Sequence, residues 1–199
     1  MIGMVKICGL TDAAAVRAAV AAGADAVGFV FAASARRVTP QQAAELAALL
    51  PADVLSVAVM QHPRADDWDE VLRTVRPRVL QTDIADFARL AVPADVQRWP
   101  VLREDGCLAA HDVLPEVFLY EGRASGRGEA VDWQQAAAFA KRGRMILAGG
   151  LSAANVGAAI RAALPWGVDV SSGVESAPGR KDPRKIAAFI AAARAAATH

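Results

Sequence analysis

Short runs of β-forming residues alternate with alanine-rich runs of helical periodicity along nearly the whole chain. Strands and helices that alternate in this way indicate a parallel sheet with helical crossovers. We count eight strand candidates, at residues 4–7, 25–31, 55–60, 79–81, 100–103, 117–121, 145–148 and 167–170. The alternation therefore predicts an α/β protein, a single (β/α)8 TIM barrel that spans residues 1–199.

The helical runs fit this closed barrel at every position but one. Helices are expected at residues 12–22, 41–50, 66–73, 84–90, 133–142, 154–163 and 183–197. After the fifth strand only residues 107–111 are available, so we expect a shortened fifth βα unit. An open doubly wound sheet is the competing fold, but it usually has fewer strands and a G-x-G-x-x-G loop, which this sequence lacks.

Composition excludes several classes of function. The chain has 199 residues, 54% of them hydrophobic, and a formal net charge of +1, which fits one globular domain and gives no basis for nucleic-acid binding. No uninterrupted apolar run is long enough for a membrane span, and no signal peptide is visible. The two cysteines lack paired spacing and the three histidines are scattered, so we predict no disulfide, no metal site and a cytoplasmic location.

Two polar corners near the C-terminus predict a phosphate site. Gly149 and Gly150 follow the seventh strand, and Ser171, Ser172 and Gly173 follow the eighth. Backbone N–H groups can approach an anion closely where no Cβ intervenes, and serine hydroxyls add donors. Each corner alone would also suit an ordinary turn. Together, after the last two strands of a barrel, they favour phosphate binding.

A cysteine at the end of the first strand is a candidate for catalysis. Cys8 shares one face of that strand with Lys6, and a lysine on this face must point into the barrel. A thiol beside a cation can ionise and act as a base or nucleophile, although cysteine is also common as a small buried hydrophobe. Asp169 on the adjoining eighth strand is expected to pair with Lys6 in a structural role.

Three further side chains have weaker claims to a functional role. The planar guanidinium of Arg36, in the loop after the second strand, suits a two-pronged contact with a carboxylate, and a solvated surface arginine is the alternative. Glu121 ends the sixth strand and can serve as a general acid if its surroundings raise its pKa. Asp83 is a second candidate for the general acid. Simple exposure or helix capping is the alternative for both carboxylates.

These residues stand in motifs that resemble the phosphoribosylanthranilate isomerase family of tryptophan biosynthesis. VKICGLT at residues 5–11 resembles its N-terminal motif, and SARRVTP at residues 34–40 resembles its Ser-Pro-Arg-Tyr-Val-Ser/Thr-Pro loop. LAGGL at residues 147–151 and VDVSSGVE at residues 168–175 resemble its last two units. The resemblance covers nearly the whole chain and is most specific at the two ends.

The resemblance implies a barrel enzyme that needs no cofactor. Its reaction is the Amadori rearrangement of N-(5-phosphoribosyl)anthranilate to 1-(2-carboxyphenylamino)-1-deoxyribulose 5-phosphate. By position, Cys8 resembles the general base, and Arg36 resembles the residue that holds the anthranilate carboxylate. The phosphate cradle of the family is matched by Gly149, Gly150, Ser171, Ser172 and Gly173.

The chain departs from the family at two strand ends. Glu121 stands where the family has an aspartate as general acid, and Thr82-Asp83-Ile84 replaces a Leu-His-Gly run after the glutamine of strand four. Asp83 therefore remains a spare candidate for the acid. A non-catalytic or divergent sugar-phosphate-binding barrel of the same descent is the alternative function. We expect a small-molecule substrate and a monomer or homodimer.

Overall fold

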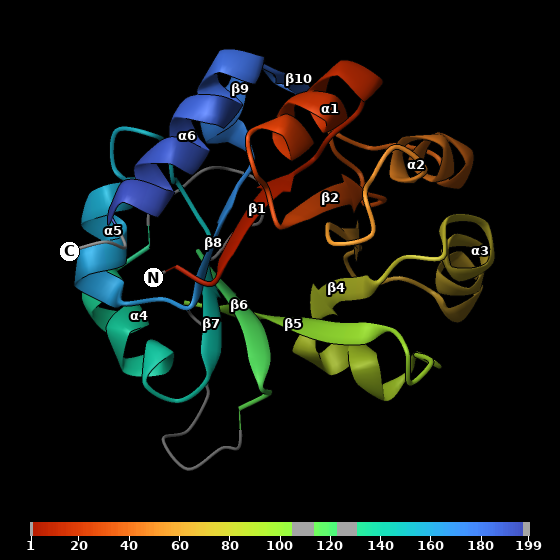
Figure 1. Ribbon diagram of the computed structural model, residues 1–199. Helices are drawn as coiled ribbons and strands as arrows, with labels where there is room; N and C mark the ends of the chain where they lie inside the picture. The colour runs from red at the N-terminus through yellow and green to blue at the C-terminus, as the bar shows by residue number, and fades with distance from the viewer. Residues whose placement is uncertain (1, 105–113, 123–130, 197–199) are drawn as a thin grey trace.

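The protein forms a closed barrel of eight parallel strands that follow one another around the barrel in chain order (Figure 1). The computed structural model describes residues 2–104, 114–122 and 131–196. The barrel strands are β1 (Met4–Cys8), β2 (Ala26–Val30), β3 (Leu55–Val59), β4 (Val79–Asp83), β5 (Gln97–Arg103), β6 (Val117–Glu121), β7 (Arg144–Leu147) and β8 (Gly167–Val170). The predicted fold class is confirmed, and the expected fifth helix at residues 107–111 lies outside the described residues.

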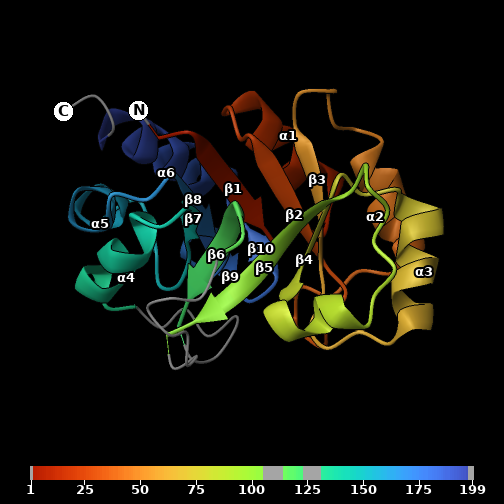
Figure 2. The same ribbon diagram turned by 90° about the horizontal axis from the view of Figure 1, so that it is seen from below.

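Helices surround the barrel on its outer side (Figures 1 and 2). They are α1 (Ala13–Ala21), α2 (Pro40–Ala47), α3 (Ala65–Val75), α4 (Trp133–Ala140), α5 (Val156–Ala163) and α6 (Pro183–Ala196), with the short 3-10 helix η1 (Ile84–Ala88) after β4. Local sequence fixes several of their starts. Asp12 accepts a hydrogen bond from the Ala15 N–H at 2.8 Å, and Thr39 forms a capping box ahead of Pro40.

Strand side chains alternate between two separate apolar clusters, as the period of two requires. The cluster inside the barrel contains Met4, Ala26, Val57, Val79, Trp99, Val101, Leu119, Ile146 and Ala148. The larger cluster lies between the strands and the helices and includes Val5, Ile7, Phe118 and Phe189. Among the described residues, no helix has the length and apolar character that a membrane crossing needs.

A small hairpin after the barrel was not predicted from the sequence. The 3-10 helix η2 (Ser172–Val174) leads into β9 (Glu175–Ala177), which pairs antiparallel with β10 (Arg180–Lys181). Its turn contains Gly179 at φ +77°, and a Cβ there would lie 2.3 Å from the Ala35 carbonyl oxygen. The hairpin therefore packs against the loop after β2. Its strands of three and two residues are too short to give a period in the sequence.

One ion pair lies inside the barrel. Lys6 is fully buried, and its Nζ donates to Asp169 Oδ1 at 2.9 Å across the β1–β8 register pair. Because both charges are removed from water, each depends on the other for its stability. Burial opposes the charge on Lys6, but Asp169 and Cys8 raise its pKa above the ordinary lysine value.

We expect Lys6→Met to lower the free energy of unfolding by about 3–5 kcal/mol, because it leaves the Asp169 carboxylate buried without a counter-charge. The double variant Lys6→Met/Asp169→Asn should recover much of this loss. Lys141→Met removes an exposed lysine and should change stability by less than about 0.5 kcal/mol. Urea denaturation of the four proteins measures these differences. A Lys6→Met variant as stable as the parent would show that the pair is not a structural requirement.

Candidate active site

A cavity of about 340 Å³ opens at the carboxyl ends of the barrel strands. Its lining includes most of the residues that the sequence singled out: Cys8, Arg36, Glu121, Gly149, Gly150, Asp169, Ser171 and Ser172. These residues come from five different strand ends or loops, so only the closed barrel brings them together. This is the face on which (β/α)8-barrel enzymes carry their chemistry.

Cys8 lies at the inner wall of this cavity and is 7% exposed. A Cβ at Gly28, its register neighbour on β2, would lie 2.9 Å from the sulfur, so a glycine is needed beside it. Burial raises the pKa of the Cys8 thiol; Lys6 opposes this effect, but Asp169 adds to it. The resulting pKa lies above the ordinary thiol value, because burial is the largest of these effects and Asp169 offsets part of the influence of Lys6.

Arg36 is held at the cavity by a carboxylate that the sequence analysis did not assign. Its Nε donates to Glu175 Oε1 at 2.7 Å and its Nη2 to Glu175 Oε2 at 2.9 Å, a two-pronged contact. The Arg36 side chain is 13% exposed, so it is not the solvated surface arginine of the alternative reading.

Lys181 is a buried cation beside the same carboxylate. Its Nζ donates to Glu175 Oε1 at 2.8 Å, to the Ser171 carbonyl at 2.9 Å and to the Ser171 hydroxyl at 3.2 Å. The Ser171 hydroxyl in turn donates to the Cys8 carbonyl at 3.1 Å. Nothing in the sequence spacing of Lys181 shows that it reaches back to the residues that follow β8.

The two polar corners lie together at the cavity, as predicted for a phosphate site. Gly149 and Gly150 have φ values of +92° and +61°, which favour glycine. Asn155 fixes this corner by donating to the Gly150 carbonyl at 2.8 Å. Gly173 is not among the lining residues. A Cβ there would lie 1.9 Å from the Leu151 carbonyl oxygen, so this glycine allows the two corners to touch.

Glu121 and Asp83 share one arginine at the other side of the barrel mouth. Arg103, at the end of β5, donates to Glu121 Oε1 at 2.5 Å through Nη1 and to Asp83 Oδ1 at 2.7 Å through Nη2. Glu121 lines the cavity, whereas Asp83 is not among the residues that line it. This difference favours Glu121 over Asp83 as the carboxyl group that meets a ligand.

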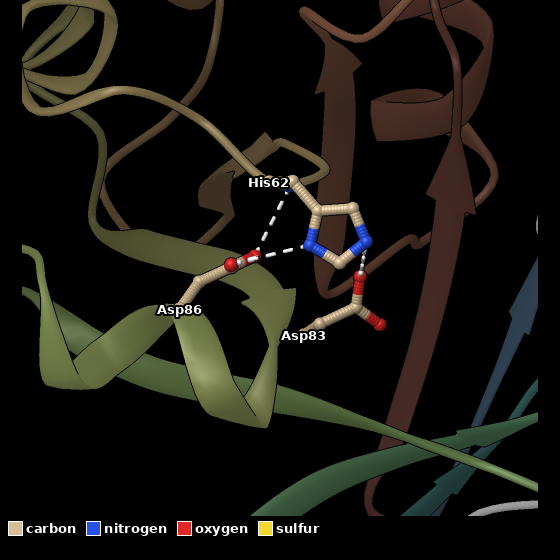
Figure 3. A group of neighbouring side chains, drawn as sticks. All are labelled: His62, Asp83 and Asp86. Carbon is tan, nitrogen blue, oxygen red and sulfur yellow. Dashed lines mark hydrogen bonds and ion pairs between the residues drawn. The ribbon is translucent and has the colours of Figure 1, made fainter.

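His62 lies between Asp83 and Asp86 in Figure 3, although the sequence gave no reason to group them. Its Nδ1 is 3.2 Å from Asp86 Oδ1 and its Nε2 is 3.4 Å from Asp83 Oδ2, and the ligand atoms all lie within 4.8 Å of one another. Each carboxylate also contacts an arginine, Arg103 or Arg89. His62 therefore has two carboxylate partners, which the scattered positions of the histidines in the sequence did not indicate. Both carboxylates already have a cationic partner.

Gln81 is a further lining residue that the sequence analysis gave no role. It is 5% exposed, and its side-chain oxygen accepts no hydrogen bond from any residue in the described part of the chain. A buried acceptor without a donor is costly unless a ligand supplies one. Gln81 is thus available to receive a hydroxyl or N–H of a bound molecule.

A closed (β/α)8 barrel with glycines, serines, an arginine and a cysteine around one cavity at the carboxyl ends of its strands has the arrangement of a (β/α)8-barrel enzyme. Residues 5–192 match the family model described as N-(5'phosphoribosyl)anthranilate (PRA) isomerase. The chain therefore belongs to the phosphoribosylanthranilate isomerase family, which makes it an isomerase of tryptophan biosynthesis, as the resemblance implied.

Individual relatives agree over almost the full length. The N-(5'-phosphoribosyl)anthranilate isomerase of Bordetella petrii is 42% identical over 209 residues, which cover 96% of this chain and 95% of the relative. The crystal structure of the phosphoribosyl anthranilate isomerase of Thermus thermophilus superposes with a TM-score of 0.82 at 28% identity, covering 96% and 98% of the two chains. A third isomerase structure, with a TM-score of 0.76 at 28% identity and coverage of 98% and 100%, is a complex with reduced 1-(o-carboxyphenylamino)-1-deoxyribulose 5-phosphate.

Alkylation of Cys8 by iodoacetamide should accelerate with pH beyond the ordinary thiol pKa of about 8.5, because only the thiolate reacts and burial raises the pKa of this thiol. Peptide mass spectrometry resolves the product at Cys8 from that at Cys107, and N-acetylcysteine in the same buffers serves as the reference. A rate at Cys8 that levels off near pH 7 would show that the thiolate forms at neutral pH.

Proposed function

We propose that this cavity binds N-(5-phosphoribosyl)anthranilate with its phosphate at β7 and β8 and its carboxylate at Arg36. The single observation that carries the proposal is that one cavity is lined by both of these sites, with Cys8 and Glu121 in the same lining. The isomerase complex with a reduced product analogue shows that a family member takes a ligand with both charged ends. A non-catalytic barrel would not need a thiol and a carboxyl group in the wall.

In the proposed reaction, Glu121 protonates the furanose ring oxygen. The ring C1′–O bond breaks with its electron pair on that oxygen, and a protonated Schiff base forms. Cys8, in its thiolate form, then removes the proton from C2′, which yields an enolamine. Protonation at C1′ and loss of the hydroxyl proton at C2′ give the ketone. C1′ is reduced and C2′ oxidised within one molecule, so this aldose–ketose isomerisation requires no cofactor.

The extra methylene of Glu121, relative to the aspartate of the family, is accommodated beside Arg103. The two residues are register neighbours at the ends of β5 and β6, and their side chains are in contact. A guanidinium stabilises a carboxylate, so the substrate must compete with Arg103 for Glu121 before the proton can be delivered.

The cytoplasmic location and the monomeric or homodimeric state remain predictions.

Cys8→Ala should lower kcat by roughly 10²- to 10⁴-fold, since the base at C2′ is removed. The loss of substrate fluorescence on addition of freshly made phosphoribosylanthranilate measures the rate. Inhibition by inorganic phosphate should remain unchanged and serves as the control for a folded site. Normal turnover by Cys8→Ala would refute the assignment of the base, and no turnover by the parent protein would refute the function.

The choice between the two carboxyl groups is tested by Glu121→Gln and Asp83→Asn. We expect the Glu121 variant to lose about 10²-fold or more in kcat, because the proton donor to the ring oxygen is gone. The Asp83 variant should lose less, since Asp83 contacts Arg103 but does not line the cavity. Steady-state kinetics on both proteins decides the question: a larger loss in Asp83→Asn would transfer the acid role to Asp83.

A further inference from the structure

The hairpin β9–β10 carries a buried ion pair that the proposed reaction does not use. The side chain of Glu175 is 6% exposed, that of Lys181 is fully buried, and their charged atoms are 2.8 Å apart. Removing two charges from water is costly, and apolar residues of similar size often give equal stability. The pair therefore calls for an explanation beyond stability.

Each member of this pair also holds one of the two proposed substrate contacts. Glu175 grips the Arg36 guanidinium through both carboxylate oxygens, at 2.7 and 2.9 Å. Lys181 donates to both the carbonyl and the hydroxyl of Ser171, at 2.9 and 3.2 Å. A continuous chain of contacts thus runs from the phosphate corner through Lys181 and Glu175 to Arg36.

The backbone of the hairpin is fixed against the same loops. Thr11 after β1 donates to the Gly179 carbonyl at 3.1 Å, and Gly179 packs closely on Ala35, the residue before Arg36. Lys185 on α6 donates to the Glu175 carbonyl at 2.7 Å. The hairpin that carries Glu175 is therefore held by α6 and by the loops after β1 and β2, and the Glu175 carboxylate contacts Arg36 in the loop after β2.

We propose that Glu175 is a positioning residue that holds Arg36 in the orientation for the substrate carboxylate, and that Lys181 ties this contact to the phosphate corner at Ser171. The hairpin then sets the separation of the two substrate contacts. A free arginine side chain has several rotamers, and the two-pronged contact selects one before the substrate arrives. This inference rests on the proposed role of Arg36.

The test is a double-mutant cycle on Glu175 and Arg36, with KM and kcat measured by substrate fluorescence. Glu175→Gln keeps the shape of the side chain but not its charge, and it should raise KM by about tenfold or more while kcat stays within about twofold. Arg36→Met should raise KM at least as much. The double variant should have the KM of Arg36→Met alone, because a positioning residue has no effect once its target is gone.

Two controls separate positioning from loss of stability. Asp25→Asn neutralises the carboxylate of another arginine ion pair, the more exposed 2.6 Å pair of Asp25 with Arg194, whose residues do not line the cavity, and it should leave KM and kcat unchanged. Inhibition of Glu175→Gln by inorganic phosphate should change by less than about twofold, since Lys181 keeps its two bonds to Ser171.

Lys181→Met tests the second link. It should weaken inhibition by inorganic phosphate and raise KM together, because Ser171 and Glu175 both lose a donor. A KM effect without a change in phosphate inhibition would overturn the link to the phosphate corner.

The outcomes distinguish this inference from the proposed function. If Arg36→Met leaves KM unchanged, the assignment of the carboxylate contact fails, and the inference fails with it. If Arg36→Met raises KM but Glu175→Gln does not, or if the two effects add in the double variant, the inference alone is overturned. A fall in kcat of Glu175→Gln equal to the loss in kcat/KM would also contradict a positioning role.

Discussion

Closure of the barrel is the constraint on which the rest of the structure depends. β1 pairs with β2 on one side and with β8 on the other, so the first and last strands of the chain are neighbours. A closed sheet has no free edge, and alternate side chains of every strand must point inward. Lys6 and Asp169, 163 residues apart, meet only because of this closure.

The same closure sets the electrostatics of the cavity. Lys6 would favour the Cys8 thiolate if it stood alone, but its partner Asp169 also lies close enough to act on the thiol. The cation therefore serves chiefly the interior ion pair, and burial keeps Cys8 protonated to a higher pH. At the opposite side of the mouth, Arg103 is shared by Glu121 and Asp83, so the replacement of two family residues has left one connected group of charges.

The hairpin β9–β10 is small, but its side chains connect the two proposed substrate contacts. Lys181 and Glu175 connect Ser171 with Arg36, which lie far apart in the sequence. The glycines of this region support close approaches: Gly173 allows Leu151 to approach, and Gly179 allows Ala35. A network of this kind holds a binding site in a fixed geometry, because Glu175 and Lys181 each contact two other residues.

The sequence by itself determined the barrel and several of the residues that line its cavity, because a period of two and helical runs are local properties. It also located Cys8, Arg36 and the two polar corners, since strand ends of a parallel barrel must share one face. Only the tertiary structure decided the partners: Glu175 for Arg36, Lys181 for Ser171, Arg103 for Glu121 and the two aspartates for His62. The physical reason is that a salt bridge depends on side-chain reach and burial between distant segments, and no periodicity in the chain records these.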